Sequence, residues 1–218
     1  MYVEQLVRFS LEGGSDPPSR LADLIAHRVD TLDPHARRAL QALAVLGDLS
    51  EPGDVARLLP KAHQLDSALD TLHSAGMIER SGVLISTSHP LLREIVLAGI
   101  PAAVRRELHQ KALGVCERRS AAIEARAQHA YYCQDSLQAL MLLEQVADRA
   151  SLRGDGATEV LALRRGLEIA RQEISRGELD DPLKAVLIFG RKLGSALTRS
   201  GDFADAEGVL REALDVAG

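Results

Sequence analysis

Tryptophan is absent from the chain of 218 residues, and aromatic residues together make up only 3% of it. β-Sandwiches and barrels draw on aromatic and β-branched side chains, whereas alanine and leucine, which dominate here, favour helices. We therefore expect a mainly α-helical fold. The two cysteines, Cys116 and Cys133, form no CxxC pair, so the sequence signals neither a disulfide framework nor a zinc site.

Long apolar runs are also missing, since none approaches the roughly 20 residues that a membrane-spanning helix needs. Residues 1–14 contain no basic leader followed by an apolar block. We expect a cytoplasmic protein with no membrane partner. The first helical pattern, over 2–12, begins without a capping residue before it, which suggests that the chain was cut from a longer one.

An excess of basic charge is lacking: 26 Lys and Arg stand against 31 Asp and Glu, for a net charge of −5. Because nucleic-acid binders usually carry a basic excess, we expect no direct nucleic-acid binding. The chain has no GxxxxGK[ST], HExxH or GxSxG motif, and its seven histidines form no short-spaced cluster with acids. We therefore expect no catalytic residue, no metal ligand and no cofactor in this chain.

Apolar residues at helical spacing predict a helix after the start signal Asp16-Pro17-Pro18-Ser19 and another over 36–46. A proline in the first turn is compatible with a helix, because its missing N–H has no intrahelical partner there. The apolar stripe of the first of these helices consists of Leu21, Leu24, Ile25, Val29 and Leu32. The stripe of the second consists of Ala36, Ala39, Leu40, Leu43 and Ala44.

Further short elements follow in close succession. Helices are predicted over 51–59 and 62–75, and residues 77–85 read as two short strands around a Ser-Gly turn. Three helices closed by a β-hairpin are the order of a winged helix. A helix resumes at His89-Pro90, and a longer one covers 101–119.

From residue 121 onward the sequence predicts only antiparallel helix pairs, and it repeats itself. Residues 154–170 align without gaps on residues 201–217, an offset of 47. The last unit resembles a tetratricopeptide repeat, although Gly190 stands at the usual tryptophan position. The residues that fit the motif are Leu193, Gly194, Leu197, Gly201, Phe203, Ala206, Leu210 and Ala213. Small residues let the two helices of a hairpin approach closely, and we expect Leu and Phe to fill the gaps between hairpins.

The resemblance implies a groove lined by the first helix of the repeat. Its groove positions are Ile188, Arg191, Ser195, Thr198 and Arg199. The helix over 183–200 also carries Lys184 and Lys192 and no acid. Four cations on one helix favour a partner with carboxylates or phosphates. The alternative is that a following repeat supplies acids that pair with them.

The run Ser86-Thr87-Ser88-His89-Pro90-Leu91-Leu92-Arg93-Glu94 resembles a recurrent stretch of the STAND class of NTPases, the signal-transduction ATPases with numerous domains. In that class, a histidine at this point of the winged helix reaches the terminal phosphate of the nucleotide in the resting, ADP-bound form. The resemblance therefore implies that His89 senses nucleotide in the full-length protein. Residues 1–8 look like the segment after the NTPase core, and 21–34 look like its helical lid. Residues 89–109 look like the junction to the repeat arm in bacterial regulators related to the maltose activator and the large ATP-binding LuxR regulators.

We expect four segments: a helical remnant of the NTPase lid (1–34), a winged-helix domain (35–100), a connecting helix (101–120) and tetratricopeptide-like repeats (121–218). The resemblance implies a regulatory region of a transcription regulator, whose NTPase domain binds ATP or ADP and lies outside this chain. The expected partners are that NTPase domain and an inducer or protein in the repeat groove. Alternatives are a winged-helix DNA-binding protein and the regulatory arm of a kinase or cyclase.

Overall fold

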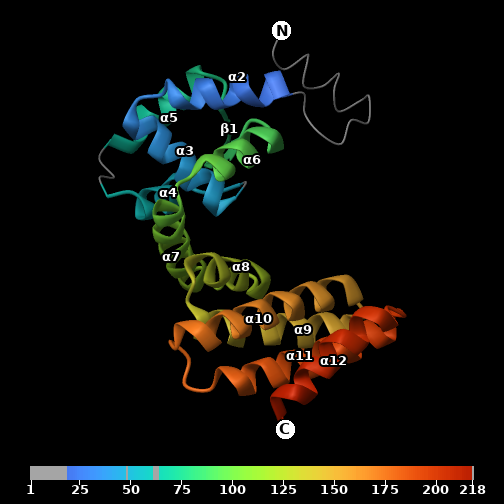
Figure 1. The fold of residues 1–218 in the computed structure, drawn as a ribbon. Coiled ribbons are helices and arrows are strands. Elements are labelled where there is room, and N and C mark those ends of the chain that lie inside the picture. The colour runs from blue at the N-terminus through green and yellow to red at the C-terminus, as the bar shows by residue number, and fades with distance from the viewer. Residues whose placement is uncertain (1–18, 48, 61–63, 218) are drawn as a thin grey trace. The chain divides into compact units, whose positions relative to one another are not determined.

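The computed structural model describes residues 19–47, 49–60 and 64–217 (Figure 1). It is mainly helical with one two-stranded antiparallel sheet, which confirms the fold class at this level. The helix expected over 2–12 lies outside the described residues. The chain divides into two compact units, one up to residue 104 and one from residue 105. In the described part of the chain, no helix is both long enough and apolar enough to cross a membrane.

The elements of the first unit agree with those expected from the sequence (Figure 1). They are α2 (Ser19–Asp30), α3 (Pro34–Leu46), α4 (Pro52–Leu58), α5 (Leu65–Ser74), β1 (Ile78–Ser81), β2 (Leu84–Thr87) and α6 (Pro90–Gly99). Helix α7 (Ala102–Arg118) follows, and most of it belongs to the second unit. The remaining helices are α8 (Ile123–Cys133), α9 (Ser136–Arg153), α10 (Gly156–Arg176), α11 (Pro182–Ser200) and α12 (Phe203–Ala217).

Helix α3 forms the centre of the first unit. It begins at Pro34, and the Asp33 carboxylate accepts the N–H groups of His35 and Ala36, as expected for an N-cap. The five apolar residues predicted for its stripe are fully buried, because α3 packs against α4, α5, α6 and β2. In α2, Leu21, Ile25 and Val29 are buried, but Leu24 is 55% exposed, so its predicted burial is wrong.

The β-hairpin also pairs with a residue outside it, which the sequence did not predict. Within the hairpin, Ile78 pairs with Thr87 and Ser81 with Leu84, and Gly82 takes a positive φ of 61° in the turn. Ser50, between α3 and α4, donates its N–H to the Ile85 carbonyl over 3.0 Å and accepts the Ile85 N–H over 2.8 Å. The segment between α3 and α4 is therefore joined to the hairpin.

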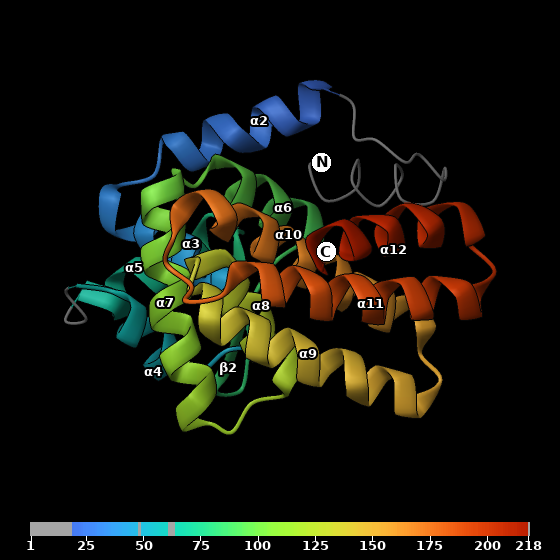
Figure 2. The same ribbon diagram turned by 60° about the horizontal axis from the view of Figure 1, so that its bottom comes forward.

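In the second unit, successive helices from α8 to α12 pack against each other in antiparallel pairs (Figures 1 and 2). The 47-residue repeat has a structural counterpart. Gly154 ends α9 and Gly201 ends α11, both with positive φ, which glycine adopts without steric cost. The two repeated segments then form α10 and α12.

Glycines permit close helix contacts in this stack. A Cβ added at Gly194 would lie 2.4 Å from Leu210 Cγ on α12, and one at Gly166 would lie 2.1 Å from Phe189 Cε1 on α11. Gly190, at the position where the repeat motif has tryptophan, faces Ala213. The expected role of small residues is confirmed. Phe203, expected to fill a gap between hairpins, is instead 67% exposed.

Candidate functional site

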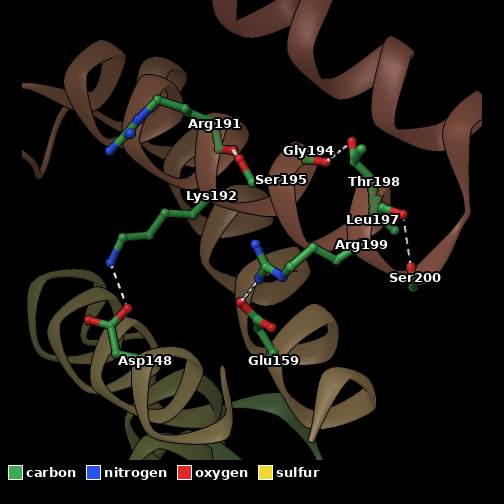
Figure 3. A network of polar contacts seen from close by, with 10 residues as sticks. All are labelled: Asp148, Glu159, Arg191, Lys192, Gly194, Ser195, Leu197, Thr198, Arg199 and Ser200. Atoms are coloured by element: carbon green, nitrogen blue, oxygen red, sulfur yellow. Dashed lines mark hydrogen bonds and ion pairs between the residues drawn. The ribbon is translucent and has the colours of Figure 1, made fainter. Parts of the chain in front are cut away.

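Half of the basic residues on α11 are paired inside the chain (Figure 3). Lys192 Nζ lies 2.7 Å from Glu144 Oε1 and 2.9 Å from Asp148 Oδ1, both on α9. Arg199 Nη2 lies 2.5 Å from Oε1 of Glu159 on α10. The acids that pair with this helix therefore come from the preceding hairpin, α9 and α10. On the sequence alone, we considered only a following repeat as their source.

The ion pairs also set the charge state of Lys192. Burial alone would lower the pKa of its ammonium group, but hydrogen bonds to Glu144 and Asp148 outweigh burial and raise that pKa above its usual value. Lys192 is therefore a fixed positive charge that holds α11 against α9. The sequence selected its neighbours Arg191 and Ser195 as groove residues, but not Lys192 itself.

The five predicted groove residues differ in their surroundings, and Figure 3 shows four of them, Arg191, Ser195, Thr198 and Arg199. Ser195 and Thr198 are exposed, and their hydroxyls donate to carbonyls one turn earlier, those of Arg191 and Gly194. Ile188 is partly buried against the core of the second unit. Arg191 is exposed, and its guanidinium forms no ion pair with any residue in the described ranges. Of these five residues, Arg191 is therefore the one whose charged side chain can bind an external acid.

His89 is the N-cap of α6. Its Nδ1 accepts the Leu91 N–H over 3.1 Å, so this nitrogen carries a lone pair. In a neutral imidazole the other nitrogen, Nε2, then carries the proton and is a hydrogen-bond donor. The cap thereby fixes the tautomer that can donate to a phosphate oxygen.

A cavity of about 310 Å³ lies beside His89 in the first unit. Its apolar lining includes Ile25, Met77 and Leu92, and its polar lining includes Arg28, His73 and His89. Arg28 donates to the Ala75 carbonyl over 2.6 Å, and His73 Nδ1 donates to the Ile78 carbonyl over 3.3 Å. The sequence pointed to neither Arg28 nor His73, because nothing in the linear pattern shows that the end of α5 meets α2.

A second histidine site is buried in the other unit. His109 on α7 and His129 on α8 are 4% and 5% exposed, and their Nδ1 atoms lie 2.9 Å apart, so one donates to the other. The Tyr132 ring lies 4.8 Å from the His109 ring. Burial, followed by the charges of His129 and Arg105, lowers the pKa of His109 to about 3.

A buried carboxylate in the second unit connects two segments of the chain that are far apart in sequence. Glu173, near the end of α10, is fully buried and accepts the Ser136 hydroxyl over 2.6 Å and the Glu178 N–H over 3.1 Å. These bonds tie the start of α9 to the loop after α10. In the described residues, no group of three or more His, Cys, Asp or Glu side chains is arranged to hold a metal ion.

Comparisons of the chain with protein-family models, curated proteins and solved structures give no match. The resemblance to STAND regulators therefore depends on the residues quoted above. The geometry adds His89, which caps α6 beside a cavity, and the partly paired basic helix α11.

Proposed function

We propose that this chain is the non-catalytic regulatory region of a STAND-type signalling ATPase that controls transcription. The observation that carries the proposal is His89, a histidine at the start of the helix after a β-hairpin, whose Nδ1 accepts the Leu91 N–H and leaves Nε2 for an external partner. In this proposal the nucleotide belongs to an NTPase domain outside this chain, and His89 donates to the terminal phosphate of bound ADP. The second unit receives an inducer or a protein partner.

The order of elements in the first unit supports a winged helix. Helices α3, α4 and α5 precede the hairpin, and Ser50 adds a strand position between α3 and α4 by pairing with Ile85. The helix that would read DNA in such a domain is α5, which carries Asp66 and Asp70 and no Arg or Lys. Arg80 of β1 lies 2.8 Å from Asp70 and neutralises one of these acids locally. An acidic helix repels phosphates, so this domain packs on protein rather than on DNA.

The second unit supports a tetratricopeptide-like arm. Its helices form antiparallel pairs, its turns repeat at an offset of 47 residues, and its glycines bring paired helices into close contact. Such arrays bind partners along an extended surface. In this arm, the exposed Arg191, Ser195 and Thr198 are the groups available to a ligand.

The proposed mechanism is a two-state equilibrium. In the resting state the winged helix holds the NTPase domain closed around ADP, and ligand binding to the arm favours the open state. A ligand shifts such an equilibrium only by its different affinity for the two states. The groove of the arm must therefore be less accessible or differently shaped in the closed state.

Replacing His89 tests this proposal in the intact protein that carries this region. His89→Asn keeps an N-cap oxygen for the Leu91 N–H but removes the imidazole, whereas His89→Ala removes both. We expect ADP release to accelerate about tenfold or more in both variants, because a hydrogen bond to a charged group contributes roughly 1.5–3 kcal/mol. Only His89→Ala should also lose about 1 kcal/mol of stability in the first unit.

The Asn variant separates the two roles of His89. If His89→Asn released ADP at the wild-type rate, His89 would be a structural cap alone and the sensor role would be wrong. The measurement is the dissociation rate of a fluorescent ADP analogue, with thermal unfolding as the control for stability.

A further inference from the structure

The cavity beside His89 is lined by several elements of the first unit. Its lining residues come from α2, the end of α5, β1 and the start of α6 (Figure 1). Helix α2 packs on α6, and α5 packs on β1. The cavity is therefore formed by elements that pack on each other within the described part of the chain.

The size and the lining of the cavity suit a small organic molecule. Its volume of about 310 Å³ lies at the lower end of the range of ligand cavities. This volume corresponds to about ten water molecules at roughly 30 Å³ each, and hence to a ligand of about ten non-hydrogen atoms. The apolar lining consists of four buried side chains, those of Ile25, Met77, Ile78 and Leu92.

The two histidines of the lining have opposite hydrogen-bonding roles. His73 Nδ1 donates to the Ile78 carbonyl over 3.3 Å, so Nε2 of the uncharged ring is an acceptor. His89 Nδ1 accepts the Leu91 N–H over 3.1 Å, so Nε2 of this ring carries the proton and is a donor. Because backbone groups fix both rings, the cavity offers a ligand one acceptor and one donor.

The charges of the lining favour an uncharged ligand. Arg28 contributes one positive charge and Glu79 one negative charge, so these two side chains cancel. An organic anion would face the carboxylate of Glu79 and the lone pair on His73 Nε2, and an organic cation would face Arg28. A molecule without net charge that carries an N–H donor next to an acceptor fits the lining better than either ion.

We propose that this cavity, here called the amide cavity, binds a small primary carboxamide with an apolar body. The amide N–H donates to His73 Nε2, and the amide carbonyl accepts the N–H of His89 Nε2. The apolar body lies on Ile25, Met77 and Leu92. The bound amide then occupies the His89 N–H that the phosphate of ADP requires, so it weakens the hold on ADP. This regulatory consequence rests on the proposed function, whereas binding of the amide does not.

Methionine methyl groups report on the amide cavity directly. The chain has three methionines, of which Met77 lines the cavity and Met141 lies 56% exposed on α9 in the other unit. The test is titration of the 218-residue protein, labelled with ¹³C at the methionine methyl groups, with phenylacetamide at pH 8, where imidazole rings are uncharged. We expect the Met77 signal to shift with a dissociation constant of about 1 mM, and the Met141 signal to stay in place. The variants Met77→Leu and Met141→Leu assign the two signals.

Analogues of phenylacetamide test the pairing of donor and acceptor. Phenylacetate and methyl phenylacetate keep the apolar body and the carbonyl group, but neither has an N–H for His73 Nε2. We expect both to bind at least fivefold more weakly, because a site that hydrogen-bonds an N–H group rejects analogues without it.

Two asparagine variants locate the amide. His73→Asn keeps a donor for the Ile78 carbonyl and His89→Asn keeps an acceptor for the Leu91 N–H, but each removes one Nε2. Each should weaken binding about fivefold, the effect of one lost hydrogen bond. The matched control is His27→Asn, at an exposed histidine of α2 that does not line the cavity, and it should leave binding unchanged.

Three results would overturn binding of a carboxamide: an unmoved Met77 signal, equal affinity for phenylacetate, or unchanged affinity in both asparagine variants. Tighter binding of adenine than of phenylacetamide would assign the cavity to a nucleobase instead.

The regulatory consequence has its own measurement in the intact protein. Saturating phenylacetamide should accelerate release of the fluorescent ADP analogue toward the rate of His89→Asn and should have no effect on that variant. Binding of the amide with unchanged ADP release would overturn the competition at His89. Failure of the proposed function is distinguishable, because it shows as wild-type ADP release by His89→Asn, whereas the Met77 titration requires no nucleotide.

Discussion

Replacing Gly166 by alanine should destabilise the second unit by about 2 kcal/mol, although alanine is the better helix former. The added Cβ would lie 2.1 Å from Cε1 of the Phe189 ring, a distance that real contacts do not reach. Phe189 is 3% exposed within the core of this unit, so its ring cannot swing into solvent. Guanidinium unfolding followed by tyrosine fluorescence measures the effect, because Tyr131 and Tyr132 both lie in the second unit.

Two further variants show whether the contact itself is responsible. Gly208 lies in α12 with nothing within 4 Å of its added Cβ, so Gly208→Ala should stabilise by up to about 1 kcal/mol. In a Phe189→Ala background, Gly166→Ala should lose most of its cost, because the ring is gone. An equal cost with and without the ring would contradict the close packing of α10 and α11.

Acid should weaken the second unit through His109. The pKa of His109 is about 3 in the folded chain, below the 6.5 of an unperturbed imidazole, so the unfolded state binds a proton first as the pH falls. The stabilisation is complete above about pH 6.5 and is lost as the pH falls toward 3. Between pH 7 and pH 5 we expect the free energy of unfolding to drop by about 2 kcal/mol from this residue alone.

A variant without the titrating group isolates this effect. His109→Gln should remove about 2 kcal/mol of the difference between unfolding free energies at pH 7 and pH 5. The exposed His35→Gln is the control and should leave that difference unchanged. If His109→Gln retained the full acid sensitivity, a different group would be responsible for it.

The sequence predicts a helix and its buried residues well where several neighbouring elements cover the apolar face of that helix. Helix α3 is an example, because four neighbouring elements cover it and all five predicted core residues are buried. Helix α2 shows the limit of this prediction. It packs on α6, which leaves Leu21 and Ile25 buried but Leu24 exposed. Periodicity gives the direction of an apolar face, whereas its width depends on neighbours that the linear sequence does not show.

The candidate sites depend on contacts between distant parts of the chain. Lys192 meets Asp148 44 residues earlier, which is close to the repeat offset of 47, so searching for opposite charges near that spacing would have found the pair. No such signal exists for His109 and His129, which approach each other only because α7 and α8 fold together. His89 is selected by the resemblance of residues 86–94 to the STAND class, whereas its role as a cap, a bond to Leu91 two residues later, is found in the structure.

We propose that this chain regulates a nucleotide-binding domain and does no chemistry itself. The most direct test is the nucleotide content of the intact protein, purified without added nucleotide and analysed by chromatography after denaturation. We expect close to one ADP per polypeptide for the wild type and clearly less for His89→Asn. An intact protein that carried no nucleotide and bound none when ADP was added would contradict it.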